Sequence, residues 1–194
     1  MNLKIHSLIR NSIEVKQQLL LDAHLMHMLE QCVTIVTNAF EQNHKVHFCG
    51  NGGSAADAQH LAAEFSGRFY KNRRALPSEA LHANSSYLTA VANDYGYDEV
   101  YARLVDGTMD KGDVLIGLST SGNSTNIVKA FETAQAKGII TIGLTGSSGG
   151  KMKPLSNYLL NIPSDITPRI QESHILLGHI ICELVEENLF TTNA

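Results

Sequence analysis

The chain has 194 residues, of which 43% are hydrophobic and 18% charged, and its formal net charge at pH 7 is −4. These values are typical of one globular α/β domain, and no stretch has the apolar length of a membrane span. The net charge supplies no general attraction for nucleic acid or for an anionic membrane. We therefore expect neither as a partner, and local groups must hold any anionic ligand.

The amino-terminal residues, from Met1 to His6, lead into a mixed polar and apolar helical pattern instead of a basic start and an apolar core. No export signal is therefore expected. The three cysteines, Cys32, Cys49 and Cys182, are widely spaced within apolar runs. An odd number of such cysteines indicates free buried thiols in a reducing compartment, so the predicted location is the cytoplasm.

Residues 1–43 show helical periodicity, with apolar side chains recurring at steps of three and four. These side chains are Leu25, Leu29, Cys32, Val33, Val36 and Phe40. The pattern then changes to short apolar runs, each followed by a Gly- or Ser-rich turn and a helical stretch. The runs cover residues 45–49, 78–81, 114–118, 139–144 and 158–162. The alternation predicts βαβ units around a parallel sheet, preceded by helices.

The last helix has a clear predicted start, because Thr167 is a suitable N-cap and Pro168 suits the first helical position. Apolar residues then recur at helical spacing to about Asn188. Residues 68–77 form a basic stretch that we interpret as a solvated loop. The sequence contains no long linker or internal repeat, so one domain is expected.

The first loop with the composition of a ligand site is Gly50-Asn51-Gly52-Gly53-Ser54, between a predicted strand and a predicted helix. Its three glycines allow a ligand to approach the backbone closely and allow positive φ angles. The plainer interpretation is a tight strand-to-helix turn. Ligands of open α/β sheets gather at the carboxyl ends of strands, which favours a ligand site.

The second such loop is Ser119-Thr120-Ser121-Gly122-Asn123-Ser124, before a helix expected near Ser124. Four hydroxyls and several backbone amides at a helix N-terminus can bind phosphate oxygens without a lysine. Each neutral hydrogen bond contributes about 0.5–1.5 kcal/mol. A helix cap would need only one hydroxyl, so we predict phosphate binding.

Two other phosphate-binding motifs fit the sequence poorly. A Walker A loop is absent, because Gly150-Lys151 is followed by Met152 and has Thr145 where the first glycine belongs. The first loop matches the dinucleotide pattern G-x-G-x-x-A, but the acidic residue expected about 20 positions later is missing. A nicotinamide enzyme is therefore a weaker hypothesis.

Several side chains could carry chemistry. His60 and Glu64 lie four apart on the helix after the first loop, so they share a face and form either a catalytic pair or a surface ion pair. On the last helix, His174 and His179 should point to different sides. Gln171 lies eight residues before His179 on the same predicted helix. That spacing alone would not predict that the two residues share a site.

The pair Asn93-Asp94 falls in a segment that we interpret as a turn.

Taken together, these residues resemble the sugar isomerase (SIS) domain and, within it, the sedoheptulose-7-phosphate isomerase family, also called phosphoheptose isomerases. The resemblance spans nearly the whole chain. It rests on Cys49 to Ser54, His60 with Glu64, Gly67-Arg68, Asn93-Asp94, Ser119 to Ser124, Thr145-Gly146, Gly149-Gly150, and Arg169 to Glu172 leading to His179. Pro168 is a departure, since some members carry an acidic residue there, and no role of that acid is carried over.

The resemblance implies a single SIS domain over residues 1–194, a three-layer αβα sandwich with a central parallel sheet, flavodoxin- or Rossmann-like, and a helical extension over about residues 1–43. It implies conversion of sedoheptulose 7-phosphate to D-glycero-D-manno-heptose 7-phosphate, the first step towards ADP-heptose and the lipopolysaccharide core. It also implies a homotetramer with sites at subunit interfaces.

The family's site residues map onto this chain by position. Glu64 and His179 would exchange protons, and a zinc ion, one per subunit, would be held by His60, Glu64, Gln171 and His179. The substrate-binding residues would be Asn51, Gly52, Gly53, Ser54, Glu64, Asn93, Asp94, Ser119, Thr120, Ser121, Ser124 and Gln171.

A non-enzymatic alternative comes from the same superfamily, in which a paralogue binds the bacterial replication initiator and promotes replication initiation. Residues 98–101 and 188–190 resemble that group. Those initiator-binding proteins lack equivalents of Glu64 and His179, which this chain has. The enzyme is therefore the favoured hypothesis.

Overall fold

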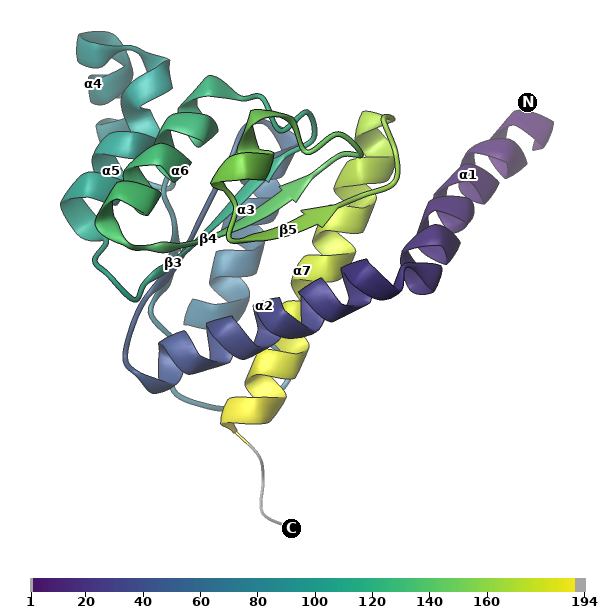
Figure 1. Ribbon diagram of the computed structural model, residues 1–194, viewed down its shortest axis with the longest axis horizontal. Helices are drawn as coiled ribbons and strands as arrows, with labels where there is room; N and C mark the ends of the chain where they lie inside the picture. The colour runs from purple at the N-terminus through teal and green to yellow at the C-terminus, as the bar shows by residue number, and fades with distance from the viewer. Residues whose placement is uncertain (1, 191–194) are drawn as a thin grey trace.

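The computed structural model describes residues 2–190, so Met1 of the predicted amino-terminal pattern lies outside the described part. Five parallel strands form one sheet with helices on both faces, which confirms the predicted fold class (Figure 1). The strands are β1 (Val46–Gly50), β2 (Ser78–Ala80), β3 (Val114–Ser119), β4 (Ile140–Thr145) and β5 (Tyr158–Asn161). Each lies within one residue of its prediction.

The helices form two layers around the sheet. They are α1 (Asn2–Leu21), α2 (Ala23–Glu41), α3 (Gly53–Ser66), α4 (Ser85–Tyr95), α5 (Val100–Thr108), α6 (Thr125–Lys137) and α7 (Thr167–Leu189), with short 3-10 helices η1 (Tyr97–Glu99) and η2 (Gly150–Leu155). One buried cluster joins α2, α3 and α7 to one face of the sheet, and another joins α5 and α6 to the other face. Every residue of β1 and β3 is buried, which explains why these strands read as continuous apolar runs.

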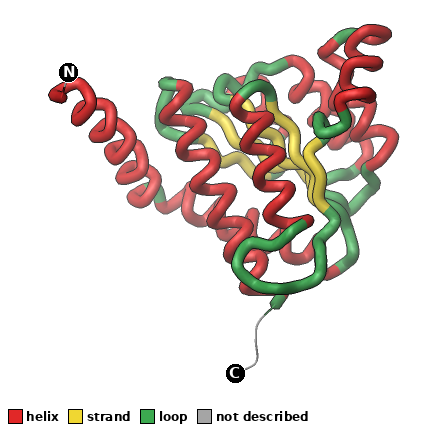
Figure 2. The backbone as a smooth tube through the Cα atoms, turned by 180° about the vertical axis from the view of Figure 1, so that it is seen from behind, coloured by secondary structure: helices red, strands yellow, loops and turns green. Residues whose placement is uncertain are grey.

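The first helix, α1, projects away from the sheet, as both views show (Figures 1 and 2). Only Val15 and Leu19 of α1 are buried. Large apolar side chains on it are at least half exposed, namely Leu3, Ile5, Leu8, Ile9, Ile13, Leu20 and Leu21. This helix therefore presents apolar surface to its surroundings.

The described residues, 2–190, contain one pair of apolar helices near the amino terminus. No single helix there is long and apolar enough to cross a bilayer, while α1 and α2 meet the criterion only as a pair bent by 78°. The three cysteines are free and buried, as expected, and burial raises the pKa of the Cys49 thiol to about 12.

The sequence-based prediction of how α7 begins was wrong by one position. Thr167 is already helical and Ile166 occupies the N-cap position, so Pro168 falls at the second helical residue. The first turn tolerates proline because its N–H groups have no intrahelical acceptor, so the sequence could not distinguish the two starts. The helix ends at Leu189, one residue beyond the expected end.

The expectation of a solvated loop over residues 68–77 was correct about the loop and wrong about one side chain. The side chain of Arg73 is only 2% exposed and forms an ion pair with Glu186 of α7 at 2.8 Å. Its neighbour Arg74 is exposed. A charge pattern along the sequence does not reveal which arginine meets a buried partner 113 residues away.

The order of the strands is β2-β1-β3-β4-β5. The chain moves outward from β1 to β2, returns to β3 on the other side of β1, and continues to β4 and β5. The point between β1 and β3 is therefore the topological switch point, where loops leave adjacent strands in opposite directions. Gly50 pairs with Leu118 at the carboxyl ends of these strands. The two predicted ligand loops thus begin side by side.

Candidate active site

The loop after β1, residues 50–54 (the glycine loop), needs its glycines for backbone reasons. Gly52 has φ of 56°, and a Cβ at Gly50 would lie 2.3 Å from the Ser54 carbonyl oxygen. Gly50 therefore passes closely over the start of α3, and the amides of Ser54 and Ala55 donate back to the carbonyls of Asn51 and Gly52, at 3.0 and 3.1 Å. Ser54 itself is buried, with 4% exposure.

The loop after β3, residues 119–124 (the serine loop), leads into α6. Ser124 stands at the N-cap, but within the described chain its side chain makes no capping hydrogen bond. Its hydroxyl lies 3.0 Å from the Ser119 hydroxyl instead. Thr120 and Ser121 line an open hollow of about 250 Å³ together with Ser147 and Ser148. The Ser124 hydroxyl therefore does not cap α6, whereas the Ser121 hydroxyl accepts a local turn hydrogen bond from the Asn123 N–H at 3.1 Å.

The two loops are joined by a pair of amides that sequence reasoning missed. Asn51 and Asn126 of α6 donate to each other's side-chain oxygens, each at 2.9 Å. The Tyr97 hydroxyl also donates to Asn51, at 3.0 Å, and the Tyr101 hydroxyl donates to the Gly50 carbonyl. These bonds fix the glycine loop against the start of α6. Asn126 lies in the first turn of α6, and Tyr97 and Tyr101 lie in η1 and α5, and the sequence pattern carried no signal that could have predicted their contacts.

The carboxylate and imidazoles of the predicted catalytic set converge. His60 Nε2 lies 2.9 Å from His179 Nε2 and 3.3 Å from Glu64 Oε1, and one ligand atom from each of the three residues lies within 4.8 Å of the others. The side chain of Glu64 is 22% exposed and that of His60 is 50% exposed. The trio of His60, Glu64 and His179 is thus open to solvent, and it confirms that His60 and Glu64 share a helix face.

Gln171 lies against the start of α3, where the glycine loop ends. Its side-chain nitrogen would be 2.7 Å from a Cβ at Gly53, and both residues line an open hollow of about 400 Å³. Asp57 lines the same hollow. Burial raises the pKa of the Asp57 carboxyl, while charge on His60 and His179 opposes the rise. Sequence reasoning missed Asp57, although it lies one helical turn before His60 on the same face.

Two further predictions have clear outcomes. His174 is fully buried and its Nε2 lies 3.2 Å from the Thr145 carbonyl oxygen, so it points away from the side of His179, as expected. The interpretation of Asn93-Asp94 as a turn was wrong, because both lie in the last turn of α4. They are exposed, and Asn93 donates to Asp94 at 2.9 Å. The turn begins just afterwards, at Gly96 with φ of 92°, so the sequence signal was misplaced by a few residues.

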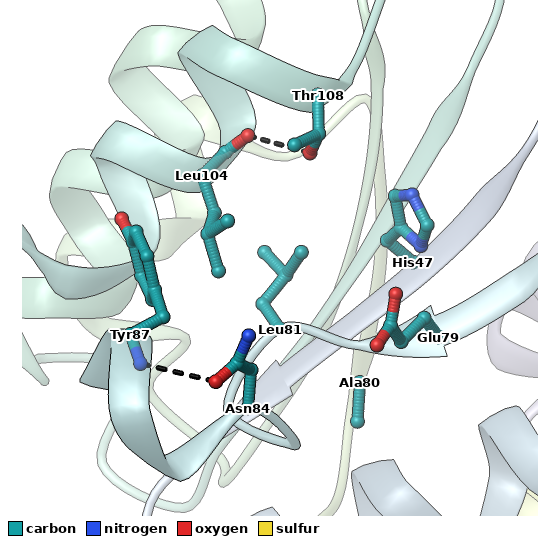
Figure 3. Close-up of a pocket in the computed structure, with 8 residues that line it drawn as sticks. All are labelled: His47, Glu79, Ala80, Leu81, Asn84, Tyr87, Leu104 and Thr108. Carbon is teal, nitrogen blue, oxygen red and sulfur yellow. Dashed lines mark hydrogen bonds between the residues drawn. The ribbon is translucent and has the colours of Figure 1, made fainter. Parts of the chain in front are cut away.

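A separate hollow of about 160 Å³ lies at the edge of the sheet, between β2 and α5 (Figure 3). It is lined by His47, Glu79, Ala80, Leu81, Asn84, Tyr87, Leu104 and Thr108. None of these described residues belongs to the glycine loop, the serine loop or the trio. Burial lowers the pKa of His47. The candidate active site is therefore at the switch point and not in this hollow.

Two loops that begin side by side at the switch point of a parallel sheet, one of them opening the helix that carries His60 and Glu64, are typical of α/β proteins that bind small ligands at this edge of the sheet. In agreement, the model of the SIS domain family matches residues 13–146. The chain belongs to this family and, within it, to the phosphoheptose isomerases, and it is an isomerase.

The relatives that carry this assignment are similar over almost their whole length. The phosphoheptose isomerase of Aneurinibacillus thermoaerophilus is 52% identical over 190 residues, covering 98% of this chain and 96% of that protein. Phosphoheptose isomerase 2 of Campylobacter jejuni is 53% identical, covering 93% and 90%. The structure of the phosphoheptose isomerase from Neisseria gonorrhoeae has a TM-score of 0.90 at 39% identity, covering 96% and 98%. None of these names refers to a replication initiator, so the non-enzymatic alternative gains no support.

Proposed function

We propose that this protein converts sedoheptulose 7-phosphate to D-glycero-D-manno-heptose 7-phosphate through an enediol, the first step towards ADP-heptose and the lipopolysaccharide core. One observation carries the proposal. Glu64 and His179, which come from different helices, both approach His60 Nε2, at 3.3 and 2.9 Å, and α3, which carries His60 and Glu64, begins at the glycine loop. A carboxylate and an imidazole in that arrangement supply a base and an acid for one substrate.

The substrate would lie across the switch point. The phosphate would bind the serine loop, because its hydroxyls and the amides at the start of α6 favour an anion. The sugar would contact the glycine loop on one side and α4 on the other. The residues that we assign to the substrate are Ser119, Thr120, Ser121 and Ser124 for the phosphate, and Asn51, Gly52, Gly53, Ser54, Glu64, Asn93, Asp94 and Gln171 for the sugar.

The reaction moves one proton between two neighbouring carbons. Glu64 would take a proton from the carbon next to the ketone and return it to the former carbonyl carbon. His179 would protonate the ketone oxygen and accept the proton of the neighbouring hydroxyl, so that no net proton is gained or lost. Backbone amides of residues 51–53 would stabilise the negative charge that develops on oxygen. The serine loop contributes orientation by fixing the far end of the substrate.

A zinc ion fits the residues present. Zinc accepts imidazole and carboxylate ligands, and two ligands about 2.0–2.1 Å from a tetrahedral ion lie about 3.4 Å apart. The separations from His60 to His179 and to Glu64, 2.9 and 3.3 Å, are close to that value. His60, Glu64, Gln171 and His179 would hold it, and it would supply Lewis-acid polarisation of the carbonyl. One nitrogen cannot bind a metal and a proton together. The zinc content of active protein therefore decides whether His179 Nε2 acts as ligand or as acid.

We further propose that the protein is a cytoplasmic homotetramer. The exposed apolar residues of α1 support association, because contiguous apolar surface of this kind is typically covered by a partner. The three free thiols support a reducing compartment. Sedimentation equilibrium should give four times the mass of one chain, and a monomer at micromolar concentration would contradict the assembly.

A coupled assay on several ketose phosphates, with and without chelator, tests the proposed reaction. We expect turnover of sedoheptulose 7-phosphate above that of six-carbon ketose phosphates. Loss of turnover with chelator, and recovery with zinc, would assign the metal role. Protein that shows no turnover with zinc supplied, and that binds the replication initiator, would instead support the non-enzymatic alternative.

A further inference from the structure

A buried ion pair lies behind the candidate active site. Glu186 of α7 is 1% exposed as a residue, and the side chain of Arg73 is 2% exposed. Arg73 Nε donates to Glu186 Oε1 at 2.8 Å. We call Arg73, Glu186 and the segment between residues 67 and 73 the latch.

Both charges of the latch are fully engaged. Glu186 accepts hydrogen bonds from the backbone N–H groups of Phe69, Tyr70 and Lys71, at 3.1, 2.7 and 2.8 Å. Burial favours the protonated carboxyl, but these bonds and Arg73 outweigh it and lower the pKa of Glu186. Three consecutive amides on one carboxylate hold the segment in a single conformation.

The guanidinium of Arg73 also binds the carboxyl end of α3. It donates to the carbonyl oxygens of Phe65 and Gly67, at 2.8 and 3.1 Å, where the helix leaves its last carbonyls without intrahelical partners. It also donates to the Glu64 carbonyl at 2.8 Å. The latch therefore fixes the backbone of the residue that we assign as the base.

The latch also contacts the residue that we assign as the acid. The ring of Phe69, whose backbone is held by Glu186, lies with its centroid 5.8 Å from that of the His179 ring, and the His60 ring lies 5.1 Å from His179 on the trio side. Glu186 follows His179 by two turns of α7, so one helix carries both. The ion pair of Arg73 and Glu186 is thus connected to Glu64 on α3 and to His179 on α7, the two residues that we assign to proton transfer.

A buried ion pair by itself is weak evidence for stability, because an apolar pair of similar volume is often equally stable. Its hydrogen bond to the Glu64 carbonyl, and the contact of the Phe69 ring with the His179 ring, point to a role in geometry instead. We propose that Glu186 and Arg73 are positioning residues that hold Glu64 and His179 at their working separation. This inference rests on the proposed function and extends it to two residues outside the trio.

Neighbouring arginines provide a matched comparison. Arg73→Gln removes the buried pair, whereas Arg74→Gln removes an exposed charge one residue away. Loss of a supporting partner typically costs about 10–100-fold in activity or metal affinity. We expect a fall of that size in kcat for sedoheptulose 7-phosphate and in Co²⁺ affinity for Arg73→Gln, with an altered Co²⁺ absorption spectrum. KM should change little, because the serine loop is untouched, and Arg74→Gln should behave as the native protein.

A second variant keeps the test valid if Arg73→Gln does not fold. Phe69→Leu leaves the side chains of the ion pair in place and removes the ring that lies against His179 and Tyr70. Its control is Val105→Ala, which creates a cavity in the core on the opposite face of the sheet. We expect Phe69→Leu to lower kcat and Co²⁺ affinity, and Val105→Ala to lower only the unfolding temperature.

The outcomes separate the inference from the function on which it rests. If native protein turns over substrate while Arg73→Gln and Phe69→Leu match it in kcat, Co²⁺ affinity and spectrum, the latch is merely structural and the inference is overturned. If native protein neither turns over substrate nor binds Co²⁺, the proposed function fails and the inference fails with it. A selective loss in the latch variants supports both.

Discussion

Placing a methyl group at Gly53 would test whether Gln171 belongs to the active site. A Cβ there would lie 2.7 Å from Gln171 Nε2, 3.2 Å from its Cδ and 3.3 Å from its Oε1. Since nonbonded atoms pack at about 3.5–4.0 Å, the Gln171 amide must retreat by about 1 Å. The obstacle is the end of a flexible side chain, so the backbone need not move.

The expected result of Gly53→Ala is a loss of activity without a loss of stability. A displacement of about 1 Å at a catalytic site can cost about 100-fold, so kcat/KM should fall by about 10- to 100-fold. Alanine is the better helix former by about 0.5–1 kcal/mol, and Gly53 is the first residue of α3, so the free energy of unfolding should change by less than about 1 kcal/mol. The coupled assay and urea unfolding measure the two quantities.

Gly107→Ala is the matched control, because Gly107 lies in α5 and a Cβ there would meet nothing within 4 Å. We expect it to leave kcat/KM unchanged. Equal kcat/KM for the two variants would refute the reasoning, since Gln171 would then have moved without consequence for the reaction.

Three other predictions concern the base, the phosphate loop and a buried histidine. Glu64→Gln should lower kcat by about 10²- to 10⁴-fold at measured metal content, and normal kcat would identify another base. Replacing Ser119 and Ser124 by Ala should raise KM for sedoheptulose 7-phosphate while the fold persists, and an unchanged KM would remove them from the phosphate site. Burial, opposed by the Thr145 carbonyl, lowers the pKa of His174 from 6.5 to about 4, so the unfolded state binds the proton more readily and stability is lost as pH falls below about 6.5. Between pH 7 and pH 5 the native protein should lose about 2 kcal/mol more unfolding free energy than His174→Gln in urea titrations, whereas equal losses would show that His174 does not titrate on unfolding.

The sheet could be predicted from sequence because its signals are local. Each buried strand is an apolar run that a Gly- or Ser-rich turn follows. The predicted first and last residues of each strand lie within one residue of those in the structure. The two ligand loops could be predicted for the same reason, since composition alone distinguishes them. The order of strands that sets the loops side by side depends on pairing across the sheet, which such local signals do not encode.

The parts of the site that could not be predicted depend on how helices pack. His60 and His179 are 119 residues apart, and their contact follows from the docking of α3 on α7. The amide pair of Asn51 and Asn126 and the burial of Arg73 likewise arise only when separate elements meet. Spacing along α7 did separate His174 from His179, because a difference of five residues places side chains on different sides of a helix.

Hydrogen exchange at the substrate carbon tests the central claim most directly. Native protein with sedoheptulose 7-phosphate in D₂O should incorporate deuterium at the carbon next to the carbonyl. Proton NMR measures this incorporation, and its rate should be no slower than that of product formation. An enediol formed at Glu64 requires this exchange whenever the base equilibrates with solvent, and Glu64→Gln should slow exchange and turnover in parallel. Product formation with full exchange retained in Glu64→Gln, or no turnover and no exchange in native protein supplied with zinc, would contradict the account.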